Sequence, residues 1–182
     1  MAPKTYLALL RGINVGGKNK INMGQLKAVF SEAGLSDVQT YINSGNVIFS
    51  SDKDARSVQS LCETLIVEHF GLTISVAVLS ADELLDAIAH APQWWGAAPD
   101  SKHNAIFVIS PARAEDICAE VGEIKPEYES IAFYGNLIFW SAPLATFSHT
   151  RWATVSKHST YQKITIRNFT TAHKLAELAK DR

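Results

Sequence analysis

The sequence predicts an α+β fold made of one repeated unit, and three observations support this prediction. Strand-like and helix-like patterns follow the order strand, helix, strand, strand, helix, strand in the first 80 residues. The same order returns in the second half. A hairpin motif also recurs, because residues 44–49 read SGNVIF and residues 134–139 read YGNLIF, with five of the six pairs identical or conservative at an offset of 90 residues. A motif that repeats at the same element of the same order indicates an internal duplication.

The first half supplies one complete unit. Apolar periodicity predicts strands over residues 4–10, 38–42, 46–50 and 72–79, and helices over residues 23–33 and 54–70. Asn22 is a typical N-cap for the first helix, and Gly34 and Gly71 are typical residues at helix ends. This order of elements is that of a ferredoxin-like unit, also called an α-β plait.

The second half repeats the unit and adds a helix at each end. The expected elements are a helix over 82–90, a strand over 104–109, a helix over 112–121, a hairpin over 130–134 and 137–141, a helix near 148–156, a strand near 162–166 and a helix near 170–180. We therefore expect two tandem ferredoxin-like units with antiparallel sheets and a C-terminal helix. Residues 1–80 would form the first unit, and residues 81–182 the linker helix, the second unit and the C-terminal helix.

Composition excludes several classes of protein. The chain has 182 residues, of which 47% are hydrophobic and 19% charged, with a formal net charge of −1, which argues against disorder and against a uniformly basic nucleic-acid binder. Cys62 and Cys118 lie in separate helical patterns and the histidines match no ligand motif, so no metal site or cofactor is expected. No apolar run is long enough to span a bilayer, so we expect a cytoplasmic protein with no membrane partner.

The near-zero net charge conceals a strong segmentation. Residues 1–31 carry five basic and no acidic residues, and residues 130–182 carry seven basic and two acidic ones, which gives +10 for the two ends. The middle, residues 32–129, has five basic and sixteen acidic residues and a charge of −11. If the ends meet in space they form a positive face, whereas charges spread over separate surfaces would form none.

A glycine-rich loop follows the first strand and resembles an anion-binding loop. Residues 12–18 match the G-x-x-x-x-G-K pattern of a P-loop, but Asn19 stands where the magnesium-binding hydroxyl belongs. Two interpretations stay open: an anion nest with Arg11, Lys18 and Lys20 around glycine amides, or a structural loop that needs glycine at positive φ.

Two further segments are unusually polar. Residues 41–47, YINSGNV, form a turn whose polar residues either only shape the hairpin or donate neutral hydrogen bonds beside the first loop. Residues 165–171, TIRNFTT, precede the last helix, for which Asn168 or Thr170 would be the N-cap. Arg167 opposes the helix dipole there, so we expect it to meet either an anionic ligand or a carboxylate from the acidic middle.

The three segments together resemble a known family. LLRGINVGGKNKINM (9–23), YINSGNVIF (41–49) and TIRNFTTAHKL (165–175) are closely similar to motifs of the uncharacterised domain-of-unknown-function family 1697. The resemblance spans essentially the whole chain and implies tandem ferredoxin-like plaits. It implies no established activity, substrate or cofactor. Phe169 stands where this motif is expected to have a tryptophan, which keeps an aromatic residue in place.

Our functional hypothesis is a site for a phosphate-bearing or nucleotide-like anion, formed by residues 11–20, 43–46 and 165–171. Its residues would supply positive charge, neutral hydrogen bonds or close backbone approach; they are Arg11, Gly12, Asn14, Gly16, Gly17, Lys18, Asn43, Ser44, Asn46, Arg167 and Asn168. Binding without chemistry, group transfer and hydrolysis all fit such a site.

Two alternatives belong to other classes. One is single-stranded nucleic-acid binding, because Tyr6 and Phe49 fall on the first and third strands as in an RNA-recognition unit, although the basic and aromatic signature is absent. The other is a non-catalytic structural or partner-binding module. The sequence names no oligomeric partner.

Overall fold

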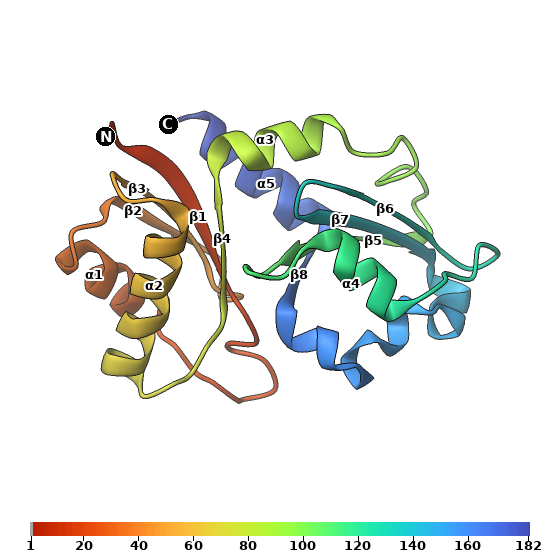
Figure 1. Ribbon diagram of the computed structural model, residues 1–182, viewed down its shortest axis with the longest axis horizontal. Coiled ribbons are helices and arrows are strands. Elements are labelled where there is room, and N and C mark those ends of the chain that lie inside the picture. The colour runs from red at the N-terminus through yellow and green to blue at the C-terminus, as the bar shows by residue number, and fades with distance from the viewer. Residues whose placement is uncertain (1) are drawn as a thin grey trace. The chain divides into compact units, whose positions relative to one another are not determined.

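Two four-stranded antiparallel sheets organise the computed structural model, which describes residues 2–182 (Figure 1). The chain divides into two compact units, one of residues up to Leu85 together with Leu175–Arg182, and one of Asp86–Lys174. The positions of these units relative to one another are not determined.

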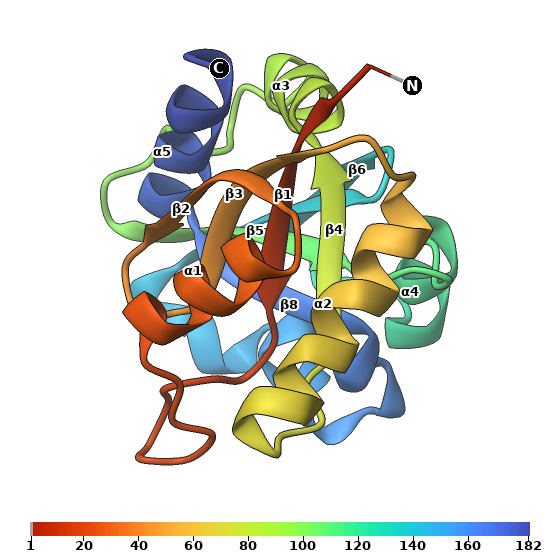
Figure 2. The ribbon, with the colours of Figure 1, turned by 90° about the vertical axis from the view of Figure 1, so that its left-hand side faces the viewer.

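The first unit is a ferredoxin-like plait, as predicted. Its elements are β1 (Lys4–Leu10), α1 (Met23–Glu32), β2 (Ser36–Tyr41), β3 (Asn46–Ser51), α2 (Ala55–Phe70) and β4 (Val76–Ser80). The sheet order is β2-β3-β1-β4, and Figure 2 shows α1 and α2 on one face of this sheet. The caps agree with the sequence, because Asn22 accepts a hydrogen bond from the amide of Gln25, and α2 ends at Gly71 with φ of 65°.

The central strand β1 is buried on both faces. Tyr6 and Ala8 point into the core beneath α1 and α2, and Leu7 and Leu9, on the other face, are fully buried as well. This explains why the strand lacks clean polar alternation: a strand buried on both faces needs apolar residues at successive positions. Packing beneath the helices includes an edge-to-face contact between Phe30 and Phe49, with ring centroids 6.0 Å apart.

The second unit repeats the sheet topology. Its elements are β5 (Ser101–Val108), α4 (Ala114–Val121), β6 (Ser130–Tyr134), β7 (Leu137–Pro143), three short 3-10 helices and β8 (Ile164–Asn168). The sheet order β6-β7-β5-β8 is the counterpart of the first. The strand pairing repeats too, since Ile48 pairs with β1 and Ile138, 90 residues later, pairs with β5. Two helices, α3 (Ala81–Ala89) and α5 (Phe169–Lys180), pass from one unit to the other.

The prediction of one regular helix near residues 148–156 is wrong. The chain there forms 3-10 helices η1 (Leu144–His149), η2 (Trp152–Lys157) and η3 (Ser159–Lys163). Serine and threonine in this segment compete for backbone hydrogen bonds, which interrupts a regular helix. Thr150 shows how, because its hydroxyl donates to the carbonyl of Phe147 and accepts from the amide of Ala153. The predicted ends of the strands also differ from the observed ones. The strand expected over 72–79 is β4, which covers Val76–Ser80.

A buried carboxylate anchors this irregular segment. Glu129 is 4% exposed, and its side-chain oxygens accept hydrogen bonds from the amides of Lys125, Arg151 and Trp152. The last two amides open η2, whose Trp152 is 1% exposed and packs near Trp140. Glu129 therefore supplies the hydrogen-bond acceptors that the start of η2 lacks.

We expect Glu129→Ala to lower the free energy of unfolding by about 2–4 kcal/mol, because it leaves three amides without their acceptor. Denaturant unfolding followed by tryptophan fluorescence measures this change. Glu127→Ala is the matched control, since Glu127 is exposed and its loss should matter by less than about 0.5 kcal/mol. Equal effects of the two substitutions would contradict the role given to Glu129.

Candidate functional site

The loop between β1 and α1 holds an unusual backbone. Five of its residues have positive φ: Gly12, Asn14, Gly16, Gly17 and Asn19. Gly16 and Gly17 are the two central residues of a tight turn that closes when the amide of Lys18 donates to the carbonyl of Val15 at 3.0 Å. Positive φ at both central positions is what a type I′ turn requires, and glycine adopts it without a steric penalty.

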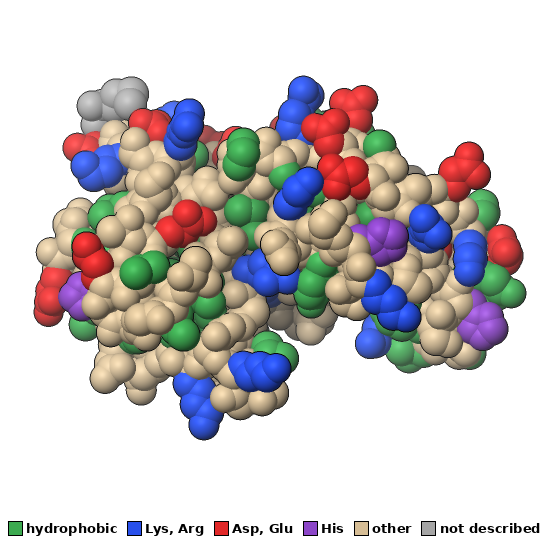
Figure 3. All heavy atoms as spheres, turned by 60° about the horizontal axis from the view of Figure 1, so that its bottom comes forward, with side chains coloured by type: hydrophobic (Ala, Val, Ile, Leu, Met, Phe, Trp, Pro, Cys, Tyr) green, Lys and Arg blue, Asp and Glu red, His purple; other side chains and the backbone are tan. Residues whose placement is uncertain are grey.

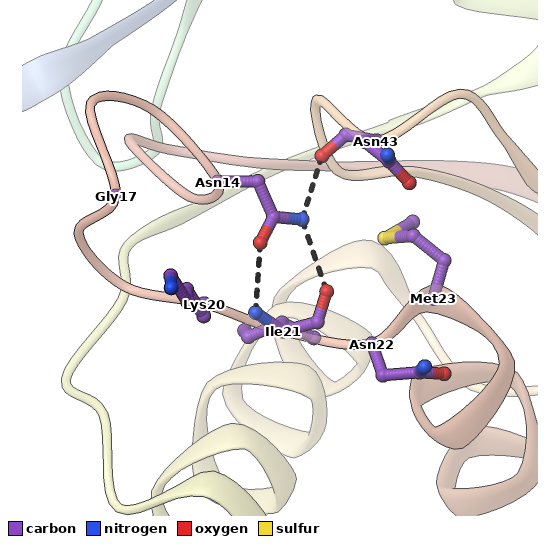
Figure 4. A pocket seen from close by; sticks show the side chains of 7 residues that line it. All are labelled: Asn14, Gly17, Lys20, Ile21, Asn22, Met23 and Asn43. Atoms are coloured by element: carbon purple, nitrogen blue, oxygen red, sulfur yellow. Dashed lines mark hydrogen bonds between the residues drawn. The ribbon is translucent and has the colours of Figure 1, made fainter.

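Asn14 fixes this loop against its neighbours. Its Nδ2 donates to the carbonyl of Ile21 at 3.0 Å and to the carbonyl of Asn43 at 2.8 Å. Its Oδ1 accepts from the amide of Ile21 at 2.8 Å (Figure 4). One amide side chain thus joins the loop, the start of α1 and the turn of the β2–β3 hairpin. Both of its hydrogens are used, so Asn14 positions the loop and has no hydrogen left for a ligand.

A pocket of about 430 Å³ lies where these three segments meet. Its lining residues come from the loop, the start of α1 and the hairpin turn; they are Asn14, Gly17, Lys20, Ile21, Asn22, Met23 and Asn43. Lys20 is the one charged residue in this lining, and the first turn of α1 contains no acidic residue. Figure 3 shows the lower edge of the first unit, where blue basic side chains appear without red acidic ones.

The structure places the predicted residues of the first unit in two groups. Asn14, Gly17 and Asn43 line the pocket. The others lie outside its lining; they are Arg11, Gly12, Gly16, Lys18, Ser44 and Asn46. Asn46 is fully buried, and its Nδ2 donates to the carbonyl of Tyr41 and the hydroxyl of Ser44, so it shapes the hairpin.

The third predicted segment belongs to the second unit. Arg167 is 7% exposed and donates to the hydroxyl of Thr165 at 2.8 Å and to the carbonyl of Ile166 at 3.0 Å. Burial lowers the pKa of Arg167 to about 10, so its guanidinium is charged at neutral pH. Asn168 caps α5, because its side-chain oxygen accepts a hydrogen bond from the amide of Thr171. It was one of the two residues expected as the N-cap. Its inclusion with Arg167 in a three-segment site stays a prediction.

Sequence reasoning placed Lys20 in the anion nest of residues 11–20, but it did not include Ile21, Asn22 and Met23 in the site. Asn22 was expected only as a helix cap. The signal that would have found them is a basic residue two positions before the N-cap, because it brings a charged group close to the helix N-terminus.

Metal and thiol chemistry find no support in residues 2–182. These residues contain no cluster of three or more histidine, cysteine, aspartate or glutamate side chains that would hold a metal ion. Burial raises the pKa of the Cys62 thiol to about 12 and of the Cys118 thiol to about 11, so both stay protonated at neutral pH. Within the same part of the chain, every helix is too short or too polar to cross a membrane.

One residue of the hairpin turn is strained. Ile42 has φ of 48° and is 50% exposed. A β-branched side chain rarely adopts this conformation, which costs on the order of 1–3 kcal/mol. Hydrogen bonds accepted by the carbonyls on either side, those of Tyr41 and Asn43, hold the backbone in place.

We expect Asn14→Asp to lower the free energy of unfolding by about 1–3 kcal/mol, because a carboxylate would face two carbonyl oxygens without a hydrogen to donate. Urea unfolding measures the change. Asn22→Asp is the matched control, since aspartate caps a helix as well as asparagine does, and it should shift stability by less than about 0.5 kcal/mol. A loss for Asn14→Asp no larger than that of the control would refute the role of the Asn14 hydrogen bonds in holding the loop.

We expect Ile42→Asn to raise the free energy of unfolding by about 1 kcal/mol, because asparagine tolerates positive φ and little apolar burial is lost. Val67→Asn, at a 48% exposed position within α2, should give no such gain. Thermal unfolding of both variants tests the strain, and an unchanged or lower midpoint for Ile42→Asn would disprove it.

Comparisons with known proteins find one matching family and a similar solved structure. Residues 4–139 match the family described as "Protein of unknown function (DUF1697)". The structure of the conserved bacterial protein SP0830 from Streptococcus pneumoniae is similar, with a TM-score of 0.89 and 30% sequence identity over 98% of this chain and 99% of that chain. Curated proteins provide no match. The sequence motifs and the duplicated plait agree with the family match: the chain belongs to the DUF1697 family.

Proposed function

We propose that the pocket beside α1 binds a small phosphate-bearing molecule, such as a nucleotide. The observation that carries the proposal is the lining itself, which combines Lys20 with a helix N-terminus and contains no acidic residue. Peptide dipoles give a helix N-terminus a partial positive charge, and its first N–H groups have no intrahelical acceptor. Phosphate groups bind at such positions in many proteins.

The hydrogen bonds of α1 support this assignment. Asn22 satisfies two amides at the helix start, since its Oδ1 accepts from Gln25 and its backbone carbonyl accepts from Leu26. Within residues 2–182, the amides of Met23 and Gly24 have no such acceptor. These two N–H groups are the donors that we assign to phosphate oxygens, with Lys20 as the neutralising charge.

The size and surface of the pocket favour an organic phosphate. Its volume of about 430 Å³ lies within the range of small-molecule sites and exceeds the needs of a bare phosphate ion. Ile21 and Met23 give it an apolar part, and Asn43 adds a neutral polar group. No aromatic side chain lines it, which favours a small molecule over a nucleic-acid strand held by base stacking.

The fuller form of the proposal adds the segment 165–171. In that form Arg167 supplies a second positive charge and Asn168 a polar contact. Arg167→Gln would then weaken phosphate binding together with Lys20→Gln. If only Lys20→Gln weakens it, the pocket of the first unit acts alone.

We expect nucleoside monophosphates, at about a hundred times Kd, to raise the thermal midpoint by about 5 °C or more, because a ligand specific for the folded state stabilises it. Lys20→Gln removes the positive charge and Asn22→Asp adds a negative one while keeping the cap. Both should abolish the shift, which differential scanning fluorimetry measures.

Lys27→Gln is the control, because Lys27 is exposed on α1 outside the pocket lining and its variant should respond like the wild type. The proposal fails if phosphorylated and unphosphorylated nucleosides give equal shifts, or if the three variants respond alike.

A further inference from the structure

Each sheet has two outer strands, and each outer strand has one side without a neighbouring strand. These strands are β2 and β4 in the first sheet and β6 and β8 in the second. Unpaired N–H and C=O groups along such an edge are a template for pairing with another chain. Proteins therefore protect edges with charged side chains, bulges or covering segments.

The edge strand β2 is protected in three ways. Arg182 donates to the main-chain carbonyl of Asp37 at 2.6 Å and to the side chain of Gln39 at 3.0 Å. Asp37 has φ of 51°, and the pairing with β3 shifts register between Ser36 and Gln39. The irregular backbone and the guanidinium both interfere with a further strand at this edge.

Charged side chains also bind the main chain of the next two edges. On β4, the carboxylates of Glu63 and Glu83 accept from the amides of Val76 and Ser80 at 3.0 and 2.7 Å. On β8, Arg167 donates to a main-chain carbonyl of the same strand. Three of the four outer strands thus have charged groups on their main-chain atoms.

The main chain of the fourth strand, β6, has none of these protections. The side chain of its last residue is engaged, because the hydroxyl of Tyr134 donates to the carboxylate of Asp86 at 3.0 Å and its ring stacks on His90. The sequence of β6, SIAFY, contains no charged residue, and the strand pairs with β7 without a shift in register. Within residues 2–182, no charged side chain makes a hydrogen bond to the main chain of β6. Phe133 and Tyr134, at its end, are 46% and 37% exposed. In the repeated sheet order β6 is the counterpart of β2. The same outer edge is therefore protected in the first unit and has no charged group on its main chain in the second.

The hairpin geometry shows which groups point outward. Two residues connect β6 to β7, and Tyr134 pairs with Leu137 across this turn. In a two-residue hairpin the flanking pair exchanges both hydrogen bonds, and the pattern then alternates along the strand. Ala132 therefore bonds to β7, while Ile131 and Phe133 direct their N–H and C=O groups away from the sheet.

The outward groups of β6 are complementary to themselves. When a second β6 runs antiparallel with Ala132 opposite Ala132 of the second copy, each Ile131 lies opposite a Phe133. Both residues have outward main-chain groups, so the two pairs form four hydrogen bonds. Aromatic and β-branched residues are favourable cross-strand partners, and no charges repel across the pair.

We propose that β6 is a docking edge for a second copy of this chain, with two β6 strands pairing about a two-fold axis at Ala132. The dimer then contains one continuous eight-stranded sheet and covers the exposed Phe133. A closed pair of identical edges uses up both, so assembly stops at two copies.

Sedimentation at increasing protein concentration tests the proposal. The wild type should move from the mass of one chain towards that of two, and Phe133→Lys should stay at one, because a charge on the edge opposes pairing. Phe133→Pro should do the same, since it removes an outward N–H and keeps the bonds to β7. Val67→Lys, which alters an exposed apolar residue elsewhere, should dimerise like the wild type.

Oxidative cross-linking tests the register. Ala132→Cys should form a disulfide between copies, because non-hydrogen-bonded partners lie about 4.5 Å apart between Cα atoms. Ser130→Cys should not, since Ser130 lies opposite Tyr134 of the second copy. A wild-type mass of one chain at all concentrations, a dimer that survives Phe133→Lys, or equal cross-linking of both cysteine variants overturns the proposal.

Discussion

Burial of the central strands on both faces is the constraint on which the rest of this structure depends. Residues 6–10 of β1 are at most 4% exposed, and Ile106 and Phe107 of β5 are buried on opposite faces. Such strands leave no room for polar side chains along their length, since a buried polar group needs a hydrogen-bond partner. Polar chemistry is therefore confined to the places where strands end and to the edges of the sheets.

The candidate site lies at a strand end for this reason. After Leu10 the chain leaves the core, and the polar loop, the helix start and the hairpin turn meet there. Beyond the end of β1 the loop has no strand partner, and the side-chain amide of Asn14 supplies hydrogen bonds that hold the three segments together. The pocket is thus a consequence of how the loop is fixed, while its charge comes from Lys20 and the start of α1.

The same constraint makes the edges of the sheets important. Strong apolar strands form a stable sheet whose outer main-chain groups attract further strands. The first unit protects its edges with Arg182, Glu63 and Glu83, whereas the second leaves β6 unprotected. Duplication supplies equivalent strands, and β2 and β6 now differ in the side chains at their edges.

Much of the fold could be predicted from the sequence, because periodicity and caps are local signals. The repeated hairpin predicted the repeated sheet, and Asn22 and Asn168 cap helices as expected. Residues 148–156 were misread as a helix, because the competition of Thr150 for backbone groups is not visible in apolar spacing. The pocket was found only in part. Asn14 and Asn46 look like ligand-binding residues in the sequence, but their hydrogens go to the backbone and to Ser44.

The most direct test of this account is an amide chemical-shift titration of the ¹⁵N-labelled protein with a nucleoside monophosphate and, separately, with its nucleoside. A phosphate at the start of α1 should shift the amides of Gly17, Met23 and Gly24 until saturation, and the nucleoside alone should leave them unchanged. Equal shifts with both compounds, or shifts confined to other parts of the chain, would contradict the assignment of this pocket to a phosphate group.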